Sequence, residues 1–275
     1  MTTSNGDRVF SGTVAQLYEQ YMVPLIFDPY ARDITRRLAP LRPSAVLEIA
    51  AGTGVVTRHM AAQLPADASI VATDLNQPML DHAMSIGTGG RPVTWRQADA
   101  MSLPFGDGTF DAVVCQFGAM FFPDKAAAFT EARRVLRPGG TFLFNVWDRI
   151  EDNEFADCVT QAMAGLFPND PPRFLARLPH GYCDQAAIAS ALVQGGFTGA
   201  KVFDTVTVQS RADSPRTVAA AYCQGTPLRN EIEARNATIL GEATDVAAAA
   251  LSHRFGKGEV TGKIQAIVVA AANGR

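Results

Sequence analysis

Several features that would point to particular protein classes are missing from this 275-residue chain. Basic residues do not dominate, because 24 Lys and Arg stand against 27 Asp and Glu, so the bulk charge does not suggest a nucleic-acid-binding surface. No apolar run approaches the ~18 residues of a membrane-spanning helix. The first ten residues also lack the charged and then apolar pattern of a secretory signal. We therefore expect no nucleic-acid partner and no membrane span.

Cysteine is scarce, and its spacing carries no metal or redox signature. The four cysteines are widely separated, and no pair has the C-x-x-C spacing of a zinc or disulfide-exchange site. His, Cys and Asp residues likewise form no close cluster along the chain. Isolated free thiols are typical of a reducing compartment. We therefore expect a cytoplasmic protein without a bound metal.

What the chain does have is an ordinary globular composition, with 47% hydrophobic and 19% charged residues. Its length fits one large domain, or one domain with a sizeable insertion. Short apolar runs alternate with helix-length segments, which predicts a parallel sheet covered on both faces, the doubly wound α/β class. The predicted strands are residues 45–50, 69–73, 93–97, 110–116, 141–147, 201–209 and 263–271.

The regions outside this alternation are predicted to be helical. Residues 14–38 have apolar side chains three and four positions apart, and Pro24 and Pro29 are expected to divide them into two short helices. Later in the chain, residues 150–182 contain four prolines and residues 210–262 are rich in alanine. We interpret these two segments as helical insertions into the C-terminal half of the domain.

The strongest chemical signal lies in residues 46–54, VLEIAAGTG, which predict a strand, a glycine turn and the start of a helix. Gly52 and Gly54 allow the backbone to pass close to a ligand. The helix that follows offers unpaired N–H groups and the positive end of its dipole. A nucleotide or a ligand carboxylate suits such a turn, although a plain tight turn between strand and helix would have the same pattern.

Two acidic residues strengthen the ligand interpretation. Asp74 ends the second predicted strand, where a carboxylate can accept both hydroxyls of a ribose. Asp99 follows the third strand and could bind an adenine amino group. Taken singly, Asp74 could be a helix cap and Asp99 a solvated loop charge. Together with the glycine turn they mark the carboxyl ends of three successive strands, where open α/β sheets bind ligands.

A nicotinamide dinucleotide is the obvious rival ligand. Its fingerprint is G-x-G-x-x-G/A, but Thr57 stands at the third position when the count starts at Gly52. Glu48, an acid inside the strand just before the turn, is also unusual for a dinucleotide site. It makes sense as a partner, direct or through water, of a cationic ammonium group. The pattern therefore favours a different cofactor, and a dinucleotide-dependent oxidoreductase is kept as an alternative.

At this point a family resemblance is clear. Residues 48–54 resemble motif I of the class I S-adenosylmethionine-dependent methyltransferases, departing from it at Ala50, where the family has its first glycine. Asp74 matches the family's ribose-binding acid, and Asp99-Ala100 its adenine-binding pair. Residues 110–116 resemble the family's strand-four motif, and residues 136–140 resemble the turn before strand five. The likeness covers residues 45–147, and the chain is most similar to ubiquinone/menaquinone-biosynthesis methyltransferases.

The resemblance implies a fold and a set of cofactor contacts. The fold is a seven-stranded Rossmann-like sheet whose last strand is antiparallel, within a single domain of residues 1–275. Residues 1–40 would form a helical lid and residues 45–147 the cofactor-binding core, while the two insertions would cap the substrate. S-adenosylmethionine would be the cofactor and S-adenosylhomocysteine its product. The implied contacts are Glu48, Ala50, Ala51, Gly52, Gly54, Asp74, Leu75, Asp99, Ala100, Gln116, Phe117 and Tyr21.

The expected activity is methyl transfer to a small, apolar or aromatic molecule by in-line attack on the sulfonium methyl. That methyl group is already activated, so alignment and exclusion of water suffice and no catalytic residue is demanded. His180 and His253 are candidates for a general base. Phe117, Met120, Phe121 and Phe122 could line an acceptor pocket or simply belong to the core. A catalytically silent cofactor-binding module with an interaction surface remains the main alternative to an enzyme.

Overall fold

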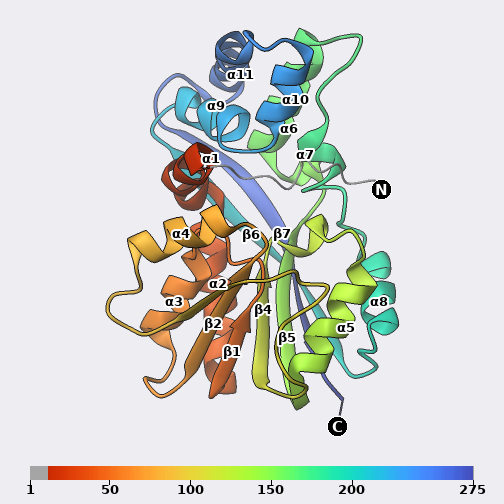
Figure 1. Ribbon diagram of the computed structural model, residues 1–275. Helices are drawn as coiled ribbons and strands as arrows, with labels where there is room; N and C mark the ends of the chain where they lie inside the picture. The colour runs from red at the N-terminus through yellow and green to blue at the C-terminus, as the bar shows by residue number, and fades with distance from the viewer. Residues whose placement is uncertain (1–11, 275) are drawn as a thin grey trace.

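The computed structural model describes residues 12–274, without the side chains of residues 12–14. Its centre is a seven-stranded sheet in the order β3-β2-β1-β4-β5-β7-β6 (Figure 1). β7 is antiparallel to both β5 and β6, which confirms the predicted class of fold. The strands are β1 (Ala45–Glu48), β2 (Ser69–Asp74), β3 (Thr94–Gln97), β4 (Phe110–Gln116), β5 (Leu136–Trp147), β6 (Lys201–Ala212) and β7 (Val260–Ala272).

The strand order reverses between β1 and β4, and this reversal positions the site. β1 pairs in parallel with β2 on one side and with β4 on the other. The chain therefore builds outward in two directions from the middle of the sheet, and right-handed crossovers put the connecting helices on opposite faces. The loops that leave the carboxyl ends of β1 and β4 diverge, so a crevice opens between them at that edge.

Helices of the core cover both faces of the sheet. α2 (Asp28–Leu38) packs against α3 (Val55–Gln63), and α5 (Lys125–Val135) packs against α8 (Gln185–Gln194). α4 (Gln77–Ile86) connects β2 to β3. The central strands are buried on both sides, since four consecutive residues of β4, from Ala112 to Cys115, are fully inaccessible to solvent. Continuous apolar runs of this kind are what a doubly covered parallel sheet requires.

The N-terminal segment is one continuous helical stretch, so the predicted division into two short helices was wrong. α1 (Gly12–Leu17) leads into a ten-residue π-helix, η2 (Tyr18–Phe27), and then directly into α2. Pro24 lies inside the π-helix, whose wider turn relieves the clash that a proline ring makes in an α-helix. Pro29 lies in the first turn of α2, where its fixed φ is compatible with the helix. Residues 1–11 of the predicted lid lie outside the described residues.

The two insertions form one helical layer, which we call the cap. The first contributes α6 (Glu154–Leu166) and α7 (Phe174–Arg177), and the second α9 (Pro215–Gln224), α10 (Leu228–Arg235) and α11 (Leu240–Phe255). α11 packs against both α6 and α9, so the insertions share an apolar interior. β6 and β7 extend beyond the rest of the sheet and carry the cap over its edge (Figure 1).

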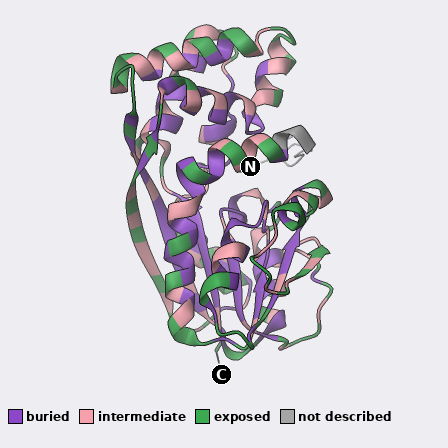
Figure 2. Ribbon diagram, turned by 90° about the vertical axis from the view of Figure 1, so that its left-hand side faces the viewer, coloured by how far each residue is buried: buried purple, intermediate pink, exposed green. Residues whose placement is uncertain are grey.

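The burial pattern of the cap matches this arrangement. Its inward sides are buried and its outer sides exposed (Figure 2). Phe155 and Val159 of α6 are fully buried, as are Ala247 and Leu251 of α11. Across residues 12–274, the longest apolar helix falls short of what a bilayer crossing requires.

Candidate active site

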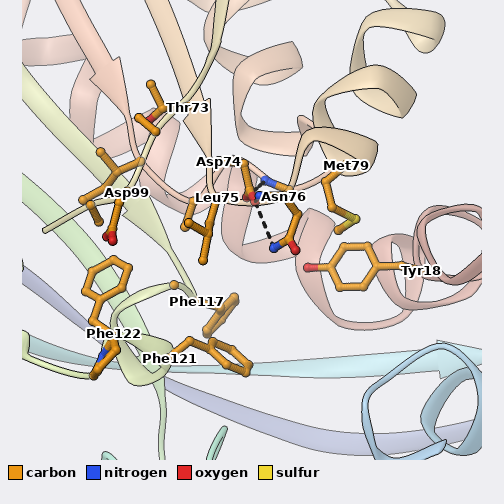
Figure 3. A pocket seen from close by; sticks show the side chains of 17 residues that line it. Tyr18, Thr73, Asp74, Leu75, Asn76, Met79, Asp99, Phe117, Phe121 and Phe122 are labelled. Atoms are coloured by element: carbon orange, nitrogen blue, oxygen red, sulfur yellow. Dashed lines mark hydrogen bonds between the residues drawn. The ribbon is translucent and has the colours of Figure 1, made fainter. Parts of the chain in front are cut away.

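The first cavity lies at the carboxyl ends of β1, β2, β3 and β4, where the strand order reverses. It encloses about 800 Å³ and opens to solvent. Its walls come from the four loops that follow these strands, together with one side chain of the π-helix (Figure 3). It is lined by Tyr18, Ile49, Ala50, Gly52, Thr73, Asp74, Leu75, Asn76, Met79, Ala98, Asp99, Ala100, Phe117, Gly118, Phe121, Phe122 and Pro123.

The turn after β1 is held in a shape that few residues adopt. Ala50, Gly52 and Gly54 all have positive φ, at 55°, 56° and 82°. A Cβ atom on Gly52 would stand 3.7 Å from the Met79 methyl group and 4.0 Å from the Tyr18 hydroxyl, both of which line the cavity. The space that this glycine leaves open is therefore part of the cavity, and a ligand can approach its backbone.

Ala50 is the position where the sequence departs from motif I. An alanine in the left-handed region costs about 1 kcal/mol, because its Cβ crowds the backbone. Its methyl group also constrains the loop after β4, since a Cβ on Gly118 would lie 2.5 Å from it. The turn after β1 and the loop after β4 approach each other closely here, and the bare backbone of Gly118 makes that possible.

Asp74 joins the second strand to the glycine turn. One carboxylate oxygen accepts the Gly52 N–H at 2.8 Å, and the other accepts the Asn76 N–H at 2.8 Å. The side chain is only 8% exposed, and this burial raises the pKa of Asp74 while the N–H donors partly offset it. A carboxylate offers about four lone-pair directions. Asp74 therefore keeps acceptor capacity toward the cavity while it fixes the turn.

Asp99 lies in the loop after β3 and lines the same cavity. One carboxylate oxygen of Asp99 accepts the Met101 N–H at 2.9 Å, which closes a turn and holds the side chain in place. Phe117, Phe121 and Phe122 lie across from Asp74 and Asp99 (Figure 3). The cavity thus has an acidic wall at the strand ends and an aromatic wall facing it.

Five of the predicted contact residues do not line the cavity, and four of them follow or end β1 and β4 and stand behind its wall. Glu48 is buried and accepts a hydrogen bond from the Thr57 hydroxyl, and burial raises the pKa of Glu48 to about 8. Gln116 donates to the Phe27 carbonyl at 3.3 Å, while its side-chain oxygen is buried without a partner among the described residues. Ala51 and Gly54 complete this group.

Gly54 has a clear packing role. A Cβ on this residue would lie 2.9 Å from the Trp95 ring and 3.2 Å from Ala83. The glycine thus allows α3 to approach its neighbours closely. Cofactor contact by Gly54 stays a prediction, as it does for the other three residues behind the wall.

The π-helix presents Tyr18 to the cavity, whereas Tyr21 is not among the lining residues. The spacing of the π-helix explains the difference, because Tyr18, Met22 and Ile26 recur every four residues and fall on one side. The same spacing is visible in the sequence and could have favoured Tyr18 over its neighbour. The sequence prediction also missed Asn76 and Gly118. Asn76 lies two residues after the end of β2, and Gly118 lies two residues after the end of β4.

A second cavity of about 580 Å³ adjoins the first. The two share Tyr18, Phe117 and Phe121 in their walls. Both insertions contribute to the second cavity, whereas none of the described cap residues lines the first. It is lined by Tyr18, Met22, Ile26, Phe27, Phe117, Phe121, Trp147, Asn153, Phe174, Leu175, Pro179, His180, Tyr222, Thr226 and Pro227.

A stacked aromatic pair lies where the two cavities adjoin. Phe117 lines both cavities, and Trp147 lines the second. The rings of Phe117 and Trp147 lie 3.8 Å apart and are almost parallel. Tyr30 contacts both rings edge-on, each with a 5.3 Å centroid separation. Phe117 has a positive φ of 49°, and its N–H donates to the Asn145 side-chain oxygen at 2.9 Å. The strained backbone at Phe117 is thus held by hydrogen bonding and by ring packing.

Of the two histidines singled out in the sequence, only His180 lines a cavity. Its Nδ1 atom lies 2.8 Å from the Asp148 carbonyl oxygen, and the side chain is 7% exposed. Burial lowers the pKa of His180 to about 4, so the imidazole is neutral near neutral pH. His253 lies on the exposed side of α11, away from both sets of lining residues.

Comparison with known proteins agrees with this geometry. Residues 47–144 match the model of the methyltransferase domain family. The chain is 32% identical to the ubiquinone/menaquinone biosynthesis C-methyltransferase UbiE of Pseudomonas aeruginosa over 165 residues, which are 55% of this chain and 64% of that protein. It is 30% identical to an uncharacterized Mycobacterium tuberculosis protein, Rv1405c, over 75% of this chain and 71% of that one.

The fold has solved counterparts as well. Phosphoethanolamine N-methyltransferase 2 of Haemonchus contortus, in complex with S-adenosylmethionine, superposes with a TM-score of 0.58 at 18% identity, covering 96% of this chain and 58% of the other. The chain belongs to the class I S-adenosylmethionine-dependent methyltransferases, whose cofactor is S-adenosylmethionine. It spans 64% of the length of its UbiE relative, a C-methyltransferase of quinone biosynthesis.

Proposed function

We propose that this protein transfers a methyl group from S-adenosylmethionine to a small molecule. The observation that carries the proposal is the pair of adjoining cavities. The first is lined by the family's motif residues, and the second is lined by the N-terminal helix and the cap. Two ligands bound in these cavities would meet at the wall formed by Tyr18, Phe117 and Phe121, which line both cavities.

The residues of the first cavity suit this cofactor. Asp74 offers carboxylate acceptors for the ribose hydroxyls, and Gly52 leaves room against the backbone of the turn. Asp99 and Ala100 would contact the adenine, with Leu75 beside the ribose. When bound, the cofactor supplies a methyl group on a positively charged sulfur. The chain's own contribution is to hold the two ligands in line and to keep water out.

The cap and the N-terminal helices would close over the acceptor. The second cavity is mostly apolar and aromatic, which favours a small apolar or aromatic acceptor over a polymer. The π-helix lies between the cap and the sheet and touches both cavities through Tyr18. We therefore assign the described part of the N-terminal segment, residues 12–40, to a lid and the two insertions to a substrate cap.

Calorimetric titration with S-adenosylmethionine, S-adenosylhomocysteine and NAD tests the cofactor. Binding of the first two but not of NAD is expected, whereas preference for NAD would favour the oxidoreductase alternative. A panel of small acceptors then tests turnover. Tight cofactor binding with no turnover on any acceptor would identify a silent binding module.

A further inference from the structure

The lining of the second cavity suits a flat ring. Its walls include the stacked Phe117 and Trp147 rings and, nearby, Phe27. On the cap side lies Phe174, whose ring centroid is 6.4 Å from that of Phe121. Aromatic walls of this kind favour planar ligands, which can stack or pack edge-on against them.

Two polar side chains of this cavity are already fully engaged. The Asn153 amide donates to the backbone carbonyls of Asp148, Arg149 and Gln265, and its oxygen accepts the Gln265 N–H at 3.0 Å. The Thr226 hydroxyl donates to the Tyr222 carbonyl and accepts the Leu228 N–H. These groups hold the cap together and leave little capacity for a ligand.

His180 differs from them, because one of its nitrogens is uncommitted. A carbonyl oxygen only accepts, so the contact with the Asp148 carbonyl requires the hydrogen to be on Nδ1. Nε2 then carries a lone pair, and it has no hydrogen-bond partner within the part of the chain that the structure describes. The imidazole lies beside Trp147, with 5.9 Å between ring centroids. A buried acceptor of protons is thus fixed in one tautomer against the aromatic wall.

We propose that the acceptor is a flat aromatic molecule carrying a hydroxyl group and that His180 Nε2 takes the proton of that hydroxyl. The inference rests on the proposed function. As the hydroxyl oxygen forms its bond to the methyl carbon, the carbon–sulfur bond breaks and its electron pair stays on sulfur. The proton moves to Nε2, so the charge lost at sulfur appears on the imidazole.

The surroundings of His180 suit this transfer. The carboxylates of Asp148, Glu151 and Asp157 act on the ring and favour its charged form, whereas burial disfavours it. Burial outweighs the carboxylates, so the resting imidazole is unprotonated near neutral pH but is a weak base. It can take the proton because the hydroxyl becomes strongly acidic as its oxygen bonds to the methyl carbon. The carboxylates then stabilise the imidazolium once it forms.

Binding without turnover gives the first test. The probes are 2-naphthol, its methyl ether and naphthalene, titrated into protein saturated with S-adenosylhomocysteine. We expect 2-naphthol to bind about three- to tenfold more tightly than its ether, as one hydrogen bond implies. His180→Asn should abolish that preference, since its shorter amide can still donate to the Asp148 carbonyl but lacks Nε2. Equal affinities in the wild type, or an unchanged preference in His180→Asn, would overturn the proposal.

Turnover on a panel of hydroxyarenes gives the second test. In His180→Gln an amide can accept a hydrogen bond but cannot take a proton, so KM should change little while kcat falls about a hundredfold. Its rate should rise with pH as the hydroxyl ionises by itself, whereas the wild-type rate should stay flat near neutrality. If His180→Gln lost the same factor in kcat at every pH, His180 would have a structural role only. If S-adenosylhomocysteine does not bind at all, the proposed function fails, and the naphthol titration repeated without it then reports on His180 separately.

Discussion

The two cavities adjoin and share three side chains, yet they are built in different ways. Short loops after β1, β2, β3 and β4 make most of the first cavity, each within a few residues of a strand end. The second is assembled from the π-helix, the loop after β4, the end of β5 and both insertions, and its lining residues span positions 18 to 227. The first cavity is formed by loops at one edge of the sheet. The second is formed by the packing of helices that are far apart in the sequence.

Their chemistry differs in the same way. The first cavity presents carboxylates whose hydrogen bonds also hold the loops in place, as Asp74 does for Gly52. The second is walled by aromatic rings and has one uncommitted imidazole nitrogen, that of His180. A cavity with carboxylates fixed at strand ends thus adjoins a cavity walled by aromatic rings from remote helices. Substitutions should therefore affect the two sites separately, and the following predictions test that separation.

The largest effect is expected from Gly52→Val. Valine would carry a β-branched side chain at a φ of 56° and would fill space that belongs to the first cavity. Binding of S-adenosylmethionine should fall more than a hundredfold by calorimetry, with far-UV circular dichroism unchanged. Gly89→Val is the matched control, since Gly89 has a φ of 66° in open space. If Gly52→Val retained the affinity, the glycine turn would not be the cofactor site.

Asp74→Ala should have the next largest effect. It removes the ribose acceptor and also the partner of the Gly52 and Asn76 N–H groups. A hydrogen bond to a charged group is worth about 1.5–3 kcal/mol, so cofactor affinity should fall about 10- to 150-fold. The exposed Asp67→Ala controls for the loss of one negative charge. Unchanged affinity in a folded Asp74→Ala protein would contradict the ribose assignment.

A reciprocal pair of substitutions should separate the two cavities directly. Met79→Trp adds bulk to the first cavity, and Leu175→Trp adds bulk to the second. We expect Met79→Trp to weaken cofactor binding at least tenfold, and Leu175→Trp to leave it within about threefold while weakening 2-naphthol binding at least tenfold. Thermal unfolding checks that overpacking has not destabilised either variant. If both variants affected both ligands equally, the cavities would be one site.

The smallest expected effects are opposite pH dependences of stability in the two regions. Burial raises the pKa of Glu48 to about 8, so its contribution to stability is present below the unfolded pKa and is lost as pH rises through about 8. Burial lowers the pKa of His180 to about 4, so its contribution is present above the unfolded pKa and is lost as pH falls toward about 4.

Single variants separate these two contributions. Glu48→Gln should gain melting temperature over the wild type as pH rises from about 5 to about 8, and His180→Asn should gain it as pH falls over the same range. Thermal unfolding across that range measures both. If the melting temperature of a variant and that of the wild type changed in parallel with pH, the substituted group would have its ordinary pKa in the folded protein.

Much of the first cavity could be predicted from sequence. All seven strands fall where the apolar runs lie, and the strand ends carry Ala50, Gly52, Asp74 and Asp99 to one edge. The side-chain directions could not be predicted in the same way. Glu48 and Gly54 belong to the same motif, yet they face the packing behind the wall.

The class of fold, the position of the glycine turn and the presence of two insertions follow from the sequence alone, because these depend on local periodicity and on residues close together in the chain. Only the tertiary structure decided that the N-terminal helix stays continuous through Pro24, that Tyr18 faces the cavities and that His180, rather than His253, reaches the second one. The physical reason is distance along the chain. The second cavity exists only where α6 and α11 pack together and hold α7 and α9 above the end of β5, and no local pattern encodes that contact.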